Sequence, residues 1–218
     1  MRNGAHINIF PAGIAFALCM VLVPGSTGYR RGLQKRIIKM GMNLYYQYQE
    51  QIKNADLIEF RANSILGSSI RAKTKQMVNH TSCALIYQMV GGEDVRRYIG
   101  ESLSDGFNLH YLSDSIKNYD GEVYWSKLKM PDNSYLRIKL AEEILKIEGK
   151  SYGYTDIIEL LFKKVKLDLN DKSPVCSAAL QIALIKAGLL DKNYNDGHIM
   201  YPGEFDKTKI YYTPIRIY

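Results

Sequence analysis

The chain has 218 residues, of which 46% are hydrophobic and 23% charged, and both fractions are near those of soluble globular proteins. This length suits one well-packed domain with an appendage, and the composition excludes a disordered, collagenous or polytopic membrane chain. Only three cysteines occur, which excludes a disulfide-stabilised secreted scaffold. Neither the cysteines nor the four scattered histidines have the spacing of zinc ligands, so we expect no structural metal and no cofactor.

The formal net charge of +7 is compatible with an anionic partner such as nucleic acid, a membrane surface or an acidic wall polymer. The basic residues are concentrated in one stretch, residues 30–39, and later ones alternate with Asp and Glu. No RNA-binding signature surrounds the 17 tyrosines. The pattern is typical of a solvated basic face beside a membrane-facing leader, and we expect no nucleic-acid partner.

Residues 1–31 are predicted to form an apolar N-terminal arm or leader, because the stretch from Ile9 to Val23 is almost wholly apolar. It has the length of a secretory signal but is shorter than the roughly 20 residues of a spanning helix. The basic cluster after it opposes translocation. Two alternatives remain for localisation: a retained arm that contacts a membrane or an assembly, or a cleaved signal of a secreted protein.

The remaining chain reads as a basic amphipathic helix in 32–54 and a single domain in 55–218. Strands are expected at Ala55–Phe60, Ser82–Val90, Val95–Glu101 and Val123–Leu128, with Gly91 and Gly92 turning a hairpin and a strand-like tail from Ile210. Helices are expected at Gly32–Gln51, Ile65–Lys75 after an Asn63 or Ser64 cap, Ser134–Glu148, Thr155–Lys164, and Cys176–Ala187 before Gly188. This predicts an α+β domain in which helices pack on a small antiparallel sheet.

Cys176 is the candidate nucleophile, because it lies in the first turn of a predicted helix. Free backbone N–H groups and the helix dipole favour negative charge there, so the thiol is biased toward the nucleophilic thiolate. The alternative is a buried cysteine that acts as a small hydrophobic residue.

A cysteine nucleophile needs a base that holds its proton at neutral pH, and histidine suits this role. His6 lies in the leader, His110 in a loop-like FNLHYL stretch and His198 in a loop rich in Gly and Asn. His80 stands where a strand begins, so it is the predicted base. Glu101 ends the partner strand of the same hairpin and is predicted to orient the imidazole if the hairpin pairs in register.

Together these segments resemble a known family. The segments that carry the resemblance are ADLIEF, NHTSCALIY, YIGESLSDGFNLHYLSD, GKSYGY, PVCSAALQIALIKAGL and YPGEF. They look like the circularly permuted papain-fold cysteine hydrolases of the YiiX-like group, relatives of NlpC-type peptidases. In that group the His and an acidic residue precede the Cys, whereas ordinary papain-fold enzymes place Cys first. The resemblance spans Ala55 to Ile217 and implies a permuted papain-like fold.

The resemblance implies acyl transfer through a Cys-His-Glu triad. Cys176 attacks a carbonyl carbon, His80 passes the proton to the leaving group, and Glu101 holds the imidazole. The backbone N–H of Cys176 stabilises the oxyanion, with Tyr152 or Tyr154 as side-chain donors.

This sequence departs from the group's pattern at three positions. Ala178 and Ala179 stand where members carry an acidic residue and an aromatic one, and Gly153 stands where they carry an aspartate. Substrate preference therefore stays open.

Three functions follow from these observations. The favoured one is a thiol peptidase or amidase acting on cell-wall peptide. The others are an acyl-lipid hydrolase or acyltransferase, and a non-catalytic component of a larger, phage-like assembly. The expected partners are a peptide, cell-wall or lipid acyl substrate, and a membrane or assembly contact through residues 1–31.

Overall fold

The computed structural model describes residue 42 and residues 44–88, 94–103, 106–151, 164–171 and 173–218. The predicted arm, the Gly91–Gly92 turn, both candidate tyrosines and nearly all of the predicted helix 155–164 lie outside these ranges. The predicted helix 32–51 is described only near its end, where residue 42 and residues 44–48 are helical and the 3-10 turn η1 (Gln49–Gln51) follows. The division into 1–31, 32–54 and 55–218 stays a prediction.

The domain is built on a six-stranded sheet in which every neighbouring pair is antiparallel. Along the sheet the order is β4-β3-β2-β1-β5-β6. The strands are β1 (Leu57–Ala62), β2 (His80–Gln88), β3 (Val95–Leu103), β4 (Gly106–Tyr111), β5 (Gly121–Ser126) and β6 (Ile215–Arg216). The α-helices that lie wholly within the described ranges are α2 (Ile65–Thr74), α3 (Leu112–Lys117), α4 (Tyr135–Leu145) and α6 (Cys176–Ala187). The 3-10 turns η2 (Tyr194–Gly197) and η3 (Phe205–Thr208) complete the described elements.

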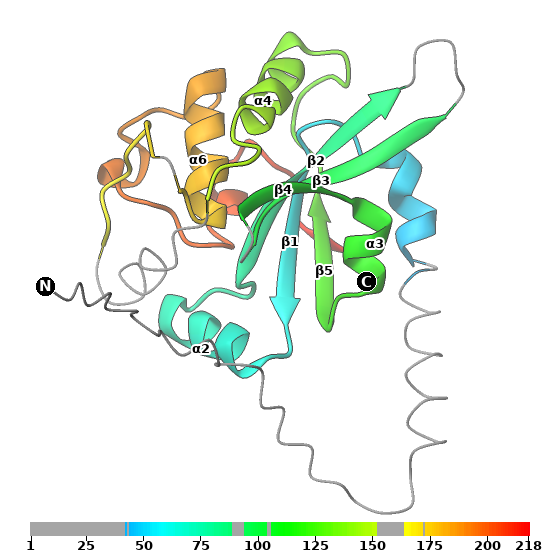
Figure 1. Ribbon diagram of the computed structural model, residues 1–218, viewed down its shortest axis with the longest axis horizontal. Helices are drawn as coiled ribbons and strands as arrows, with labels where there is room; N and C mark the ends of the chain where they lie inside the picture. The colour runs from blue at the N-terminus through cyan, green and yellow to red at the C-terminus, as the bar shows by residue number, and fades with distance from the viewer. Residues whose placement is uncertain (1–41, 43, 89–93, 104–105, 152–163, 172) are drawn as a thin grey trace, which may run out of the picture.

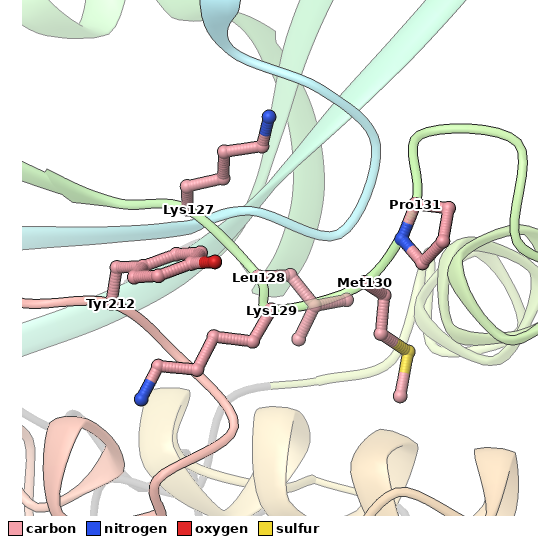
Figure 2. A pocket seen from close by; sticks show the side chains of 6 residues that line it. All are labelled: Lys127, Leu128, Lys129, Met130, Pro131 and Tyr212. Carbon is pink, nitrogen blue, oxygen red and sulfur yellow. The ribbon is translucent and has the colours of Figure 1, made fainter.

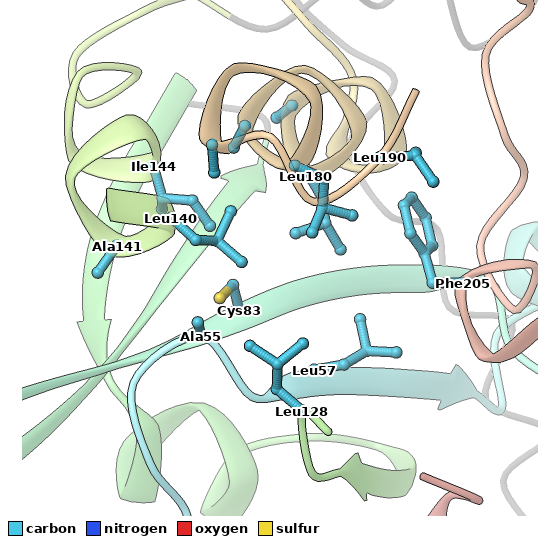
Figure 3. Packing of buried hydrophobic residues seen from close by; sticks show 14 of the residues in the cluster. Ala55, Leu57, Cys83, Leu128, Leu140, Ala141, Ile144, Leu180, Leu190 and Phe205 are labelled. Carbon is cyan, nitrogen blue, oxygen red and sulfur yellow. The ribbon is translucent and has the colours of Figure 1, made fainter. Parts of the chain in front are cut away.

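Helices cover both faces of the sheet, as Figure 1 shows. On one face α4 and α6 pack side by side over β2 and β3, and Leu140 and Leu180 point toward Leu57 and Cys83 of the sheet (Figure 3). On the other face α3 and the helical residues 42–48 bury a second cluster that includes Ile58. Because side chains alternate along a strand, neighbouring residues of β1 supply both cores. The predicted α+β class, with a small antiparallel sheet packed with helices, is confirmed.

Two predicted helices are confirmed at their ends. Helix α2 begins after Ser64, whose Oγ accepts a hydrogen bond from the Gly67 N–H at 3.1 Å. Helix α6 has the predicted bounds and ends at Gly188, whose φ of 83° is the left-handed conformation that glycine adopts without strain.

The prediction of a loop at FNLHYL is wrong. This stretch forms strand β4, which pairs with β3 along its length, and α3 follows it without any connecting residue. Phe107 and Leu109 pack in the core under α4 and α6, so the stretch alternates as a strand does. Strand β2 also begins at His80, two residues before the predicted start.

A buried ion pair joins α4 to the start of β1. Arg137 Nη1 lies 2.8 Å from Asp56 Oδ1, and neither side chain is exposed. The same carboxylate accepts hydrogen bonds from the Trp125 Nε1 and from the backbone N–H of Leu128 and Lys53. Arg137 in turn donates to three backbone carbonyls, so this pair is fully hydrogen-bonded.

Within the described ranges, no helix has the length and apolar character that crossing a membrane requires.

Candidate active site

The first turn of α6 is held against the end of β3. Val175 precedes the helix in an extended conformation and is buried, and its carbonyl accepts the Ala179 N–H at 2.8 Å. The Ser102 Oγ of β3 donates to the carbonyl of Pro174 at 3.1 Å. These contacts fix Cys176, the first residue of α6, beside the sheet.

The β2–β3 pairing opens at this point. The paired register runs from Gln88 with Val95 to Cys83 with Gly100, and Thr81 lies beyond its end. The Ala84 N–H donates to the carbonyl of Asp56, just before β1, so by alternation the N–H groups of Cys83 and Thr81 are on the β3 side of the strand. Because Thr81 lies beyond the paired register, its N–H faces the Cys176 sulfur and not a carbonyl of β3. The thiol therefore approaches the sheet where the ladder has ended.

His80 and Glu101 meet at the same place. Cys83 pairs with Gly100, and residues that pair across antiparallel strands share a face of the sheet. Glu101 follows Gly100, so its side chain is on the opposite face, together with those of Ser82 and His80. His80 Nε2 lies 3.4 Å from Glu101 Oε1, and the two side chains are 14% and 7% exposed. This distance is long for a hydrogen bond, so the contact is a loose one. The imidazole therefore has the Glu101 carboxylate as a charged neighbour but is not tightly bonded to it.

The imidazole also faces the Cys176 thiol, and the two groups shift each other's pKa. Burial disfavours the charged imidazole, but the facing Cys176 and Glu101 outweigh it and raise the pKa of His80 above its ordinary value. Burial also disfavours the thiolate, but His80 and the backbone N–H groups of Thr81 and Ser177 outweigh it and lower the pKa of Cys176. The two shifts favour a thiolate beside an imidazolium.

Glu101 is kept ionised by its neighbours. Burial raises the pKa of this carboxyl, but His80 and the Ser115 hydroxyl, which donates to Oε2 at 2.8 Å, lower it below its ordinary value. The Phe60 ring packs beside the imidazole, with centroids 5.3 Å apart. Sequence reasoning missed Ser115 and the Thr81 N–H, because each depends on elements whose pairing or position the sequence did not show.

The other candidate residues lie elsewhere. His110 is on β4 paired with Ile99, near enough to Glu101 to lower the pKa of its carboxyl. His198 contacts the Asn195 carbonyl at 3.3 Å after η2. Cys83 is buried under α4 and α6, and burial raises the pKa of its thiol. The structure therefore groups Cys176, His80 and Glu101, and the two tyrosines lie outside the described residues.

A surface pocket of about 480 Å³ is found away from these residues. Figure 2 shows it between the segment after β5 and the C-terminal tail, lined by Lys127, Leu128, Lys129, Met130, Pro131 and Tyr212. Lys129 Nζ lies 5.4 Å from the centre of the Tyr212 ring. None of the lining groups is a thiol, an imidazole or a carboxylate, so this pocket is not the candidate active site.

No family model matches the sequence, and no curated protein matches it. Among solved structures the chain is similar to the crystal structure of metalloprotein YiiX from Escherichia coli, with a TM-score of 0.56 and 15% sequence identity. The alignment covers 76% of this chain and 97% of that one. The chain has a YiiX-like fold. At this identity the likeness shows the fold alone, so the relation to permuted papain-fold enzymes and NlpC-type peptidases is taken up below as a proposal.

That YiiX structure is described as a metalloprotein. Within the part of the chain that the structure describes, no group of three or more His, Cys, Asp or Glu side chains is placed so that it could hold a metal ion, and this includes Cys176, His80 and Glu101. His80 is already placed between Cys176 and Glu101. The described residues do not fit a metal site.

Proposed function

We propose that this chain is a cysteine hydrolase that cleaves an acyl bond through a thioester intermediate. Cys176 is the nucleophile, His80 the general base and acid, and Glu101 the group that orients the imidazole. The observation that carries the proposal is the meeting of these three side chains at the open end of the β2–β3 ladder, with the pKa of the thiol lowered and that of the imidazole raised.

In the first half-reaction the Cys176 thiolate attacks the carbonyl carbon of the substrate. The bond from that carbon to the leaving group breaks, and the His80 imidazolium donates its proton to the leaving amine or alcohol. In the second half-reaction His80 takes a proton from water, the resulting hydroxide attacks the thioester, and the carboxylic acid leaves as the thiolate is restored. Glu101 keeps its charge throughout and stabilises the imidazolium when it forms.

The oxyanion is stabilised by the start of α6. The N–H groups of a helix's first turn have no intrahelical partner, so the Cys176 N–H is a donor placed beside the reacting sulfur. Tyr152 and Tyr154 are proposed as further donors.

The order of the three residues supports a permuted papain-like relation. His80 and Glu101 lie on adjacent strands before the helix that carries Cys176, within a YiiX-like fold. We therefore propose kinship with permuted papain-fold enzymes and NlpC-type peptidases, and we propose an amide in cell-wall peptide as the substrate.

A second substrate class, a lipid ester, is favoured by one observation. Ile65 and Leu66 at the start of α2 are 88% and 63% exposed, and residues 75–79 join this helix to His80. Contiguous exposed apolar surface marks contact with an apolar partner when it is extensive, and these two side chains would form part of such a surface. An acyl-lipid hydrolase or acyltransferase uses the same nucleophile, so the two classes differ in substrate and not in mechanism.

The experiment incubates the full chain separately with cell-wall digests and with lipid extracts, and follows both products and the mass of the protein. We expect a substrate-dependent acyl adduct on Cys176 and new products from one of the two mixtures. Cys176→Ala abolishes both, and the matched control Cys83→Ala retains both. An unmodified Cys176 with no products from either mixture contradicts the proposal and favours a non-catalytic component of an assembly.

A further inference from the structure

We propose that Ser115 is a positioning residue that holds the Glu101 carboxylate toward His80. Helix α3, which carries Ser115, thereby supports the residue that orients the imidazole. The inference rests on the proposed function, because it concerns how the imidazole of that site is oriented.

The contact is specific in geometry. The Ser115 Oγ donates to Oε2 of Glu101 at 2.8 Å, while the other oxygen, Oε1, faces His80 Nε2 at 3.4 Å. One carboxylate oxygen is therefore held by a good hydrogen bond, and the second is directed at the imidazole. Removing the hydroxyl frees the carboxylate to rotate about its terminal torsion, which is a soft one.

Helix α3 is a firm support despite its six residues. Leu112 and Ile116 are fully buried in the core on this face of the sheet. Ser115 lies three residues after Leu112 and beside Ile116, so it shares their inward side of the helix. Ser115 is the polar residue on this side of the helix, and its hydroxyl meets the Glu101 carboxylate there.

Among the described residues, Glu101 has titratable neighbours on three elements or segments. His80 faces it from β2 and His110 from β4, and both lower the pKa of its carboxyl when charged. Tyr119, after α3, has its own pKa raised mainly by burial and also by Glu101. Because Ser115 is neutral, it stabilises the Glu101 charge without competing with His80 for it.

Loss of the Ser115 hydroxyl changes the thiol–imidazole pair in a definite direction. Glu101 then stabilises the imidazolium less well, so the pKa of His80 falls and that of Cys176 rises. The pH range in which thiolate and imidazolium coexist narrows from both sides. A hydrogen bond to a charged group is strong enough that each limit moves by up to about one pH unit, a ten-fold change in the protonation ratio.

The test measures the rate of Cys176 alkylation by iodoacetamide from pH 4 to pH 11 in the full chain, with adducts located by mass spectrometry. Ser115→Ala is compared with the wild type, with Ser115→Thr, which keeps the hydroxyl, and with Ser113→Ala on the same helix. We expect the acid midpoint to rise and the alkaline midpoint to fall in Ser115→Ala alone. The fraction of folded protein is followed in parallel by circular dichroism.

Each outcome is decisive. A Ser115→Ala profile that coincides with a wild-type profile showing a low-pKa thiol overturns the role of Ser115 and leaves the proposed function standing. A wild type without a low-pKa thiol contradicts the proposed function, and the role of Ser115 fails with it. A uniform loss of rate at every pH, with unmoved midpoints, shows a merely structural effect and also overturns the inference.

Discussion

Replacing the buried carboxyl of Glu59 by an amide is expected to change how the stability of this protein depends on pH. Glu59 is 2% exposed on β1, and its Oε1 accepts the Gly203 N–H at 3.1 Å. Burial and the charge of Asp206 together raise the pKa of this carboxyl from 4.5 to about 7, against the opposing effect of the Gly203 N–H.

The magnitude follows from the two pKa values. Below pH 4.5 the carboxyl is protonated in both the folded and the unfolded chain, so it adds no pH dependence. Between pH 4.5 and 7 the unfolded chain loses this proton while the folded chain keeps it, and stability falls as pH rises. Above pH 7 the loss is complete and amounts to about 3 kcal/mol, from 7 minus 4.5 units at about 1.4 kcal/mol each.

Glu59→Gln keeps the shape and the acceptor for Gly203 but cannot ionise. We expect its free energy of unfolding, measured by urea denaturation at half-unit steps from pH 4.5 to 8.5, to rise relative to the wild type by about 3 kcal/mol across that range. The matched control is Glu148→Gln, since Glu148 is exposed after α4. Parallel curves for Glu59→Gln and the wild type, whatever their constant offset, would refute the reasoning.

Three further outcomes are expected. Iodoacetamide at pH 7 should label Cys176 before Cys83, because burial raises the pKa of the Cys83 thiol; equal labelling read by peptide mass spectrometry contradicts this. His80→Ala should move the pH midpoint of Cys176 alkylation up toward about 8.5, the pKa of an ordinary thiol, and slow labelling at pH 6 by about ten-fold or more. An unmoved midpoint would show that His80 does not lower the pKa of the Cys176 thiol. Arg137→Met should cost about 3–5 kcal/mol of unfolding free energy because it leaves Asp56 buried without its partner, and a loss under about 1 kcal/mol in urea denaturation would show that the carboxylate is not held by the pair.

Residue order and local signals were enough to predict α6 and to name the three side chains that meet at its first turn. The cap of α2 and the end of α6 at Gly188 are local features that neighbouring residues decide. The pairing of β2 with β3 brings Glu101 to the face of His80, and this follows from strand alternation once the hairpin is assumed. The roles of these residues remain predictions.

Other parts of the site depend on long-range packing. Strand β4 is only six residues long and passes into α3 with no glycine or proline between them, so its alternating pattern was too short to separate from a loop. Without β4 and α3, nothing in the sequence brings Ser115 to Glu101. The Thr81 N–H becomes available only because the β2–β3 ladder ends at Cys83, which is a property of the folded sheet.

The buried ion pair of Asp56 with Arg137 and the contact of His80 with Glu101 differ in how tightly their side chains are bonded. Asp56 and Arg137 are unexposed and fully hydrogen-bonded, so any movement of a proton or charge there breaks several bonds at once. His80 Nε2 and Glu101 Oε1 are 3.4 Å apart, which is a long contact for a hydrogen bond. An imidazole that is oriented by a charge but not tightly bonded to it changes its protonation state at little structural cost. The proposed proton transfer is therefore assigned to the second of these pairs, beside the Cys176 thiol.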